Sequence, residues 1–306
     1  TYHIVEGVQS TINSFTVTGL DELPQDYAYK INEICTIDTT AKYSGRLIDE
    51  KQGSILTFCR DNGYMLCSTI GNPYVQIDTI KNKVDVQISF NLGNRYKIKD
   101  IRVEKTGEGK ELVDDELVKD VADIQDSSYY SLYELQKAQV RLYRTNLFGS
   151  ALITGVSSDT SGNYVPINII TDIGLLHELS PEIIVNNEEN AFNLGFSLGY
   201  TKKNFLGSAR KLSLSTSTAA QSITEFLMHP ELNDTTVYGY ADIRGSIEQP
   251  FLFGEPINTK FETYLTVQKK EAEYNATIYG TKVNLTFELP RKVYLTSFGT
   301  YFNWEY

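Results

Sequence analysis

The segment AFNLGFSLGYTKKNFLGSARKLSLSTST, residues 191–218, decides how the chain is interpreted. From Phe192 to Tyr200 a large apolar residue occupies every second position, with asparagine, glycine and serine between them. A period of two places the two kinds of side chain on opposite faces of a β-strand. After a turn at 202–204 the alternation resumes in residues 211–215, which predicts a β-hairpin. Because its polar face carries small residues, we interpret it as the first hairpin of a transmembrane β-barrel, whose interior is wet.

Composition restricts the remaining possibilities. With 306 residues, 41% hydrophobic and 22% charged, the chain has the balance of a folded protein of two or three domains. Its net charge of −11 argues against nucleic acid or anionic lipid as the main partner. The 21 Tyr and 14 Phe fit aromatic girdles, although tyrosine-rich soluble β domains share this feature. No run approaches the ~18 apolar residues that a membrane helix needs, so a membrane crossing would use strands.

Chain ends and cysteines add two expectations. The chain begins at Thr1 rather than at methionine, so we expect a processed or trimmed protein, and a lost export signal stays open. The three cysteines, Cys35, Cys59 and Cys67, lack metal-site spacing. We expect small buried thiols, and a single pair in an oxidising compartment is the alternative.

Upstream of the hairpin, a unit of about 85 residues occurs twice. Each copy is expected to run strand, helix, helix, strand, strand; for example, Arg60 and Asn62 align with Arg144 and Asn146 at an offset of 84. The firmest helix spans 44–62, with Ser44 as N-cap and Gly63 at its C-terminal end. In the first copy, the strands after the helices are expected at 65–70, continued at 74–80, and at 83–90.

The expected fold is therefore α+β repeats of β-α-α-β-β order followed by an incomplete antiparallel transmembrane β-barrel. The part after the repeats contains about six alternating strands, whereas the smallest closed barrels have ~8. We expect the chain to end inside its barrel, because an open sheet edge is not tolerated in lipid. The predicted division is residues 1–10, the end of a preceding repeat; 11–93, one repeat; 94–178, the last repeat; and 179–306, the N-terminal part of the barrel.

Three segments in this order carry a resemblance: IVEGVQSTINSFTVTG (4–19), FNLGNRYKIKDIRVEKTG (90–107) and FNLGFSLGYTKKNFLGSARKLSLS (192–215). They resemble the POTRA domains and barrel start of the BamA/TamA family of outer-membrane β-barrel assembly proteins, and look closer to the TamA-like members. The resemblance implies POTRA repeats in the periplasm and a barrel in the outer membrane of a Gram-negative cell. It also implies unfolded outer-membrane protein clients, a lipid bilayer, and either other assembly-complex subunits or a TamB-like partner, with no catalytic residue and no cofactor.

Candidate site residues follow from strand edges rather than from side-chain chemistry. In the family, the barrel opens laterally beside its first strand, which implies a seam strand here made of Phe192, Leu194, Gly195, Phe196, Leu198, Gly199 and Tyr200. Its two glycines either weaken the strand or make room inside the lumen. Outer strands of the repeats can accept an extended client by β-augmentation, and the candidate edges are Tyr74, Val75, Ile77, Ala151 and Ile153.

No catalytic or cofactor motif competes with this interpretation. Residues 195–199 match GxSxG, but a hydrolase needs a sharp strand-to-helix turn around the serine, and here a continuous strand is expected. The histidines are scattered, and no phosphate-binding glycine loop is present. Two alternatives stay open: a two-partner secretion pore for one dedicated client, and a soluble tyrosine-rich adhesin or accessory domain. Solubility of residues 190–306 without detergent would support the latter.

Overall fold

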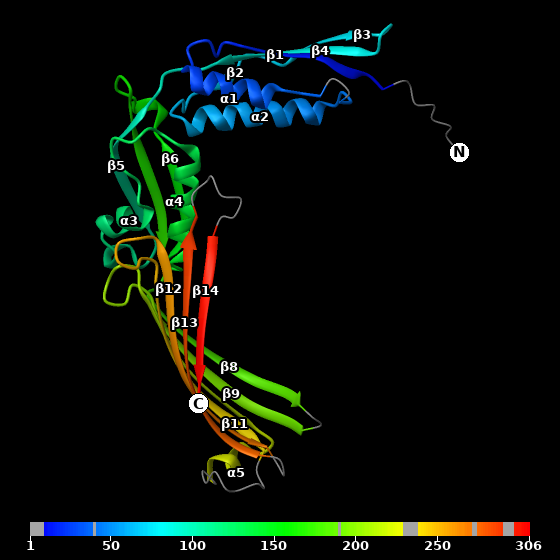
Figure 1. The fold of residues 1–306 in the computed structure, drawn as a ribbon. Helices are drawn as coiled ribbons and strands as arrows, with labels where there is room; N and C mark the ends of the chain where they lie inside the picture. The colour runs from blue at the N-terminus through cyan, green and yellow to red at the C-terminus, as the bar shows by residue number, and fades with distance from the viewer. Residues whose placement is uncertain (1–8, 39–40, 189–190, 229–237, 271–273, 290–296) are drawn as a thin grey trace. The chain divides into compact units, whose positions relative to one another are not determined.

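The computed structural model describes residues 9–38, 41–188, 191–228, 238–270, 274–289 and 297–306 (Figure 1). The chain forms two compact units. The first unit contains residues 1–102, 124–137 and 153–169, and the second contains residues 103–123, 138–152 and 170–306. The division passes through the second repeat, so each unit contains part of it.

The first repeat is a small sheet with two helices. Its elements are β1 (Thr11–Thr18), α1 (Gln25–Cys35), α2 (Gly45–Asp61), β2 (Ser68–Thr69), β3 (Tyr74–Asp78) and β4 (Lys83–Asn91). The central strand β4 pairs parallel with β1 and antiparallel with β2 and β3. The sequence pattern predicted one strand at 65–70 with its continuation at 74–80. In the structure β2 and β3 are separate strands, because Gly71, at a φ of 68°, and Pro73 interrupt the chain between them.

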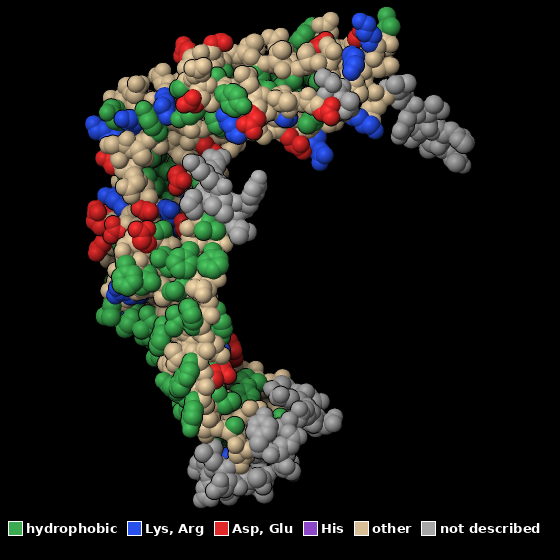
Figure 2. Space-filling model, viewed as in Figure 1, with side chains coloured by type: hydrophobic (Ala, Val, Ile, Leu, Met, Phe, Trp, Pro, Cys, Tyr) green, Lys and Arg blue, Asp and Glu red, His purple; other side chains and the backbone are tan. Residues whose placement is uncertain are grey.

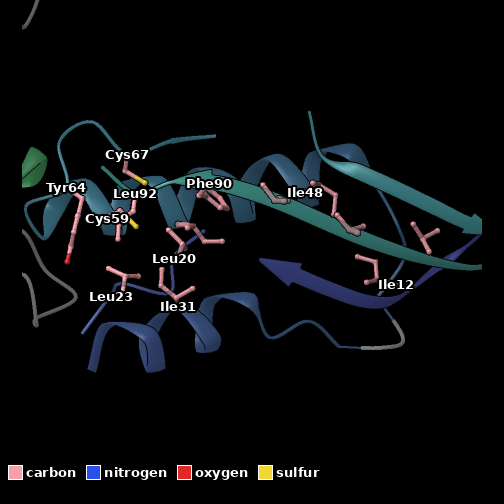
Figure 3. Packing of buried hydrophobic residues seen from close by; sticks show 14 residues of the cluster. Ile12, Leu20, Leu23, Ile31, Ile48, Cys59, Tyr64, Cys67, Phe90 and Leu92 are labelled. Carbon is pink, nitrogen blue, oxygen red and sulfur yellow. The ribbon is translucent and has the colours of Figure 1, made fainter. Parts of the chain in front are cut away.

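The core of this repeat lies between β4 and the helices (Figure 3). Every second side chain of β4 is buried, and these residues pack with apolar residues of α1 and α2, the set being Val84, Val86, Ile88, Phe90, Ile31, Ile48, Ile55 and Cys59. Each such side chain contributes about 1.5–3 kcal/mol on burial. The predicted N-cap is confirmed: Ser44 Oγ accepts a hydrogen bond from the Leu47 amide at 3.2 Å. Gly63 has the positive φ, 104°, expected after the helix.

The second repeat has the same element order. It comprises β5 (Lys97–Thr106), α3 (Asp115–Ala122), α4 (Leu132–Arg144), β6 (Phe148–Gly155) and β7 (Tyr164–Ile173), and its sheet order is β5-β7-β6. The apolar faces of its helices are buried at Val118, Val121, Leu135, Ala138 and Leu142. The β-α-α-β-β repeat is therefore confirmed.

A long antiparallel sheet follows. Its strands are β8 (His177–Glu188), β9 (Ala191–Lys202), β10 (Lys211–Ala220), β11 (Gly239–Gln249), β12 (Ile257–Lys270), β13 (Tyr274–Glu288) and β14 (Ser297–Glu305), and the short helix α5 (Ile223–Met228) lies between β10 and β11. Each strand pairs antiparallel with its neighbours in sequence. Within the described residues β8 and β14 do not pair with each other, so the sheet is not closed.

The sequence pattern missed the first strand of this sheet. β8 pairs along its whole length with β9, from His177 opposite Lys202 to Glu188 opposite Ala191. Its sequence does not alternate cleanly, because Pro181 and the run Ile183–Val185 interrupt the period of two. Proline is tolerated in a strand at a sheet edge, where one side of the backbone needs no partner. The sheet therefore has seven strands rather than about six, and the strand predicted to begin it is the second.

Candidate membrane-facing sheet and exposed strand edges

One face of the seven-stranded sheet is apolar and exposed. In the observed register, residues directly opposite each other on neighbouring strands share a face. The large exposed hydrophobic side chains that fall on this face are Leu179, Ile183, Val185, Phe192, Leu194, Phe196, Leu198, Leu214, Ile243, Ile247, Phe261, Leu265, Tyr279, Phe298, Phe302 and Trp304. Figure 2 shows hydrophobic side chains gathered over strands of this sheet. A soluble monomer rarely exposes such a continuous apolar surface, so this face is a membrane or protein contact surface.

The other face of the sheet is polar. Arg244 on β11 pairs with Asp242 at 3.2 Å and with Glu262 on β12 at 3.3 Å. Lys260 pairs with the same Glu262 at 3.0 Å. Thr266 donates a hydrogen bond to Asp242 at 2.6 Å. Charges held in such a network belong on a wet surface, so the sheet separates an apolar side from an aqueous side, as a barrel wall does.

A glycine on β13 accommodates a tyrosine ring on this polar face. Tyr264 on β12 lies opposite Gly280, and its hydroxyl donates to Glu305 on β14. A Cβ atom at position 280 would lie 2.2 Å from the Tyr264 ring. The glycine therefore lets the ring cross the neighbouring strand and reach the next one.

No helix among the described residues is both long and apolar enough to cross a membrane.

The predicted seam residues lie within the sheet rather than at its edge. β9 has β8 on one side and β10 on the other, and this corrects its assignment as the first strand. The five large side chains of the predicted seam, Phe192, Leu194, Phe196, Leu198 and Tyr200, share the apolar face. The edge strand on this side is β8.

The two glycines of β9 differ in their surroundings. A Cβ atom at Gly195 would lie 2.1 Å from the Thr218 carbonyl oxygen on β10, whereas one at Gly199 would meet nothing nearer than Ser180 at 3.7 Å. Gly195 is therefore required for the close approach of two backbones. Gly199 occupies a position where a small side chain fits.

The position of residues 195–199 shows that their GxSxG pattern does not form the turn of a hydrolase nucleophile. They lie inside the continuous strand β9, and Ser197 is paired across it with Glu182 and with Ser217. The strand-to-helix turn that a hydrolase nucleophile requires is absent at this position.

The predicted client edges lie on two separate sheets. β3 pairs with β4 on one side only among the described residues, and Tyr74 and Ile77 on it are 64% and 52% exposed. β6 is the edge of the second repeat's sheet, but Ala151 and Ile153 on it are buried, at 3% and 7% exposed. At β6 these two side chains belong to the core, and the Tyr143 hydroxyl already bonds to both the amide and the carbonyl oxygen of Ala151 at 3.2 Å.

Sequence reasoning missed a clamp between α4 and β13, which we define as Arg141, Arg144 and Glu288. Arg141 Nε and Nη2 each lie 3.1 Å from Glu288 Oε2, and Arg144 Nη1 lies 2.9 Å from Oε1. The side chains of Arg141 and Glu288 are only 11% and 10% exposed. Arg141 also donates to the Ala122 carbonyl oxygen at 3.1 Å. No local sequence signal identifies partners so far apart in the chain.

The three cysteines lie in or against the core of the first repeat. Cys59 and Cys67 are buried, and Cys35 is half-buried. No cluster of metal-ligating side chains occurs in the part of the chain that the structure describes.

No protein-family model matches the sequence, and no curated protein matches it. Among solved structures, BamA from Haemophilus ducreyi lacking POTRA domains 1–3 is similar, with a TM-score of 0.62 and 15% identity over 96% of this chain and 50% of that chain. CdiB from Acinetobacter baumannii is similar, with a TM-score of 0.51 and 12% identity over 94% of this chain and 52% of that chain. This chain thus spans about half the length of the solved chains it matches.

At such identities the likeness concerns the fold. The expected closeness to TamA-like members is not supported, since the two solved structures reported above are a BamA and a CdiB. The chain therefore has the fold of these proteins: POTRA-like β-α-α-β-β repeats followed by a seven-stranded antiparallel sheet that corresponds to part of the BamA barrel.

Proposed function

We propose that this chain is the POTRA and early barrel part of an outer-membrane protein that inserts or translocates other β-rich proteins without catalysing a chemical reaction. The observation that carries the proposal is the two-faced sheet. Its apolar face suits lipid, and its opposite face carries an ion-pair network. The repeats would lie in the Gram-negative periplasm and the sheet in the outer membrane.

The repeats would receive clients at their strand edges. An extended segment of an unfolded outer-membrane protein can add to β3 as a further strand, forming main-chain hydrogen bonds at its open side. Exposed Tyr74 and Ile77 then supply apolar contacts beside that edge, with half-buried Val75 between them. β6 is a second candidate edge, where a client would pair with backbone groups other than those of Ala151, which the Tyr143 hydroxyl occupies.

The lateral seam would be lined by β8 rather than by β9. β8 contributes the free edge on the N-terminal side of the sheet, and its Pro181 weakens the ladder that a closing strand would form. β9 then serves as the first fully paired strand behind the seam. Other assembly-complex subunits or a TamB-like protein are candidate partners for the repeats.

Site-specific photo-crosslinking in the full-length protein tests the client edge. Probes at Tyr74 and Ile77 are expected to capture unfolded barrel proteins. A probe at Tyr29, which is 75% exposed on α1, is the matched control and is expected to capture none. Equal capture at all three positions would contradict β-augmentation at β3.

A second candidate function is a two-partner secretion pore, which the likeness to CdiB favours. Depletion of the full-length protein separates the two functions. Loss of many outer-membrane barrel proteins supports assembly, whereas loss of one exported protein, with the barrel proteins unchanged, supports secretion.

A further inference from the structure

Residues 59–67, the last turn of α2 and the loop after it, contact the second repeat, and we call this segment the joint loop. Asp61 Oδ1 accepts a hydrogen bond from the Tyr133 amide at 2.8 Å, beside the N-terminus of α4. The Gly63 carbonyl oxygen accepts from the Tyr96 amide at 2.9 Å. A carboxylate at a helix N-terminus is favoured by the helix dipole, so the first contact combines a charge with a hydrogen bond. The joint loop therefore attaches the first repeat to the start of β5 and α4.

Arg95 reinforces the same attachment. Its Nε donates to the Asn62 carbonyl oxygen at 3.0 Å, and its guanidinium carbon lies 3.6 Å from the centre of the Tyr129 ring. Its Nη2 donates to the Tyr27 hydroxyl at 3.0 Å. One side chain thus contacts the joint loop, α1 of the first repeat and a loop of the second.

Two cysteines bound the joint loop. Cys59 is the last buried residue of α2, Cys67 ends the loop, and both are completely buried in one core cluster. The Tyr64 amide donates to the Cys59 carbonyl oxygen at 3.1 Å, and the Cys67 amide donates to the Tyr64 carbonyl oxygen at 3.0 Å, which folds the loop back on itself. The two thiols are near enough to shift each other's pKa, and Figure 3 places both sulfur atoms in the same part of the core.

The surroundings make the two thiols unequal. The Cys59 thiol lowers the pKa of Cys67, and the nearby Arg60 guanidinium acts in the same direction against the effect of burial. The Cys67 thiol and burial raise the pKa of Cys59. A thiolate is the nucleophile in disulfide exchange, so these shifts favour Cys67 as the attacking thiol once the joint loop has formed and while the core is still open.

We propose that Cys59 and Cys67 form a disulfide that closes the joint loop. The Cys67 thiolate attacks a disulfide donor, such as oxidised glutathione or an oxidised thiol–disulfide oxidoreductase, and releases one donor thiol. Cys59 then attacks the Cys67 sulfur of the mixed disulfide and releases the second donor thiol. The two protein thiols are oxidised, the donor is reduced, and their two protons pass to the donor thiols.

Burial places this reaction during folding of the repeat, before the core closes over the sulfurs. The finished disulfide is then shielded from reductants. This inference rests on the proposed function in one respect, because the periplasm supplies the oxidising conditions.

Thiol counting tests the pairing. The full chain is denatured, refolded with oxidised glutathione, denatured again in acid and labelled with a polyethylene glycol maleimide. Of its three cysteines, one is expected to be labelled, and all three after reduction. Cys35→Ser is the matched control, with no labelled thiol expected before reduction, and Cys59→Ser is expected to leave two. Three labelled thiols in the oxidised wild type, or a disulfide that includes Cys35 in a peptide map, would overturn the proposal.

Hydrogen exchange tests the consequence for the joint. In the oxidised wild-type chain the Tyr133 and Tyr96 amides are expected to exchange several-fold more slowly than in the reduced chain, because Asp61 and Gly63 are held in place. Equal exchange in both forms would overturn the role of the disulfide at the joint. If the disulfide forms in vitro and protein taken from cells still has three free thiols, the pairing stands and the periplasmic placement of the repeats is contradicted instead.

Discussion

Glu288→Gln is the substitution that tests the clamp between α4 and β13. The amide keeps the size of the side chain but removes the charge that faces Arg141 and Arg144. Glu288 accepts from Arg141 Nε and Nη2 at 3.1 Å and from Arg144 Nη1 at 2.9 Å. An amide oxygen can retain part of these contacts, whereas its NH₂ group would face a guanidinium and form none.

The expected loss follows from burial. Removing one partner of a buried ion pair costs about 3–5 kcal/mol, while an exposed pair is worth less than about 1 kcal/mol. Arg141 and Glu288 are 11% and 10% exposed, but Arg144 is 38% exposed and therefore partly screened. Asp123, at 3.6 Å, still neutralises part of the Arg141 charge. We expect a local loss of about 2–3 kcal/mol, which is roughly a 30- to 160-fold increase in local opening.

Hydrogen exchange of the full chain in lipid is the assay. Amides at the C-terminal end of α4 are expected to exchange faster by that factor in Glu288→Gln. Glu33→Gln is the control, because its pair with Lys30 is 52% and 59% exposed and the amides near it should change by less than about threefold. If Glu288→Gln changes exchange in α4 no more than the control changes it in α1, the clamp does not hold the helix and the reasoning is refuted.

Three further substitutions test the sheet and the first repeat. Ile183→Lys places a charge on the apolar face of β8 and should lower the free energy of unfolding by about 2–4 kcal/mol if that face meets lipid. Ser180→Lys, on the opposite face, should be tolerated. The fraction of folded protein is measured by comparing the gel migration of unheated and heated samples, and an equal folded fraction for both variants would contradict the lipid-facing assignment. Gly280→Val should prevent folding of the sheet because its side chain would overlap Tyr264, and Tyr264→Ala should restore folding in the same assay; a folded single variant would disprove the overlap. The pKa of the Asp85 carboxyl lies below its ordinary value because side chains of β1 donate hydrogen bonds to it. Since the folded-state pKa is the lower one, the stabilisation is present above the unfolded pKa of about 3.9 and is lost as pH falls through the folded value; exchange of β1 amides should rise only in that acidic range, and Asp85→Asn should remove the pH dependence.

The elements with regular patterns were predictable. The helix beginning after Ser44 has an N-cap, an apolar stripe and a terminal glycine, and each of these signals is local. The hairpin β9–β10 alternates strictly. The large apolar side chains of β9 that were predicted to share one face of the strand do so in the observed pairing with β10. In both cases the information lies within a few residues of where it acts.

The first strand of the sheet was not predictable in the same way. β8 contains Pro181 and three consecutive branched apolar residues, so its own pattern does not identify an exposed and a buried face. Its strand character comes from pairing with β9, a neighbour that supplies hydrogen bonds along its whole length. A non-local partner overrode weak local propensity. For this reason the sequence analysis placed the seam on β9, whereas the edge strand is β8.

The sequence by itself determined the repeat, the two-faced strands and the absence of a membrane-helix pattern, because these depend on the period of apolar residues along the chain. Only the tertiary structure decided which strand lies at the edge, that Ala151 and Ile153 face the core, and that Glu288 meets two arginines of α4. The same holds for Cys59 and Cys67, whose thiols meet because the joint loop folds back on itself. Edges, burial and ion pairs depend on which distant segments meet, and a one-dimensional pattern does not carry that information.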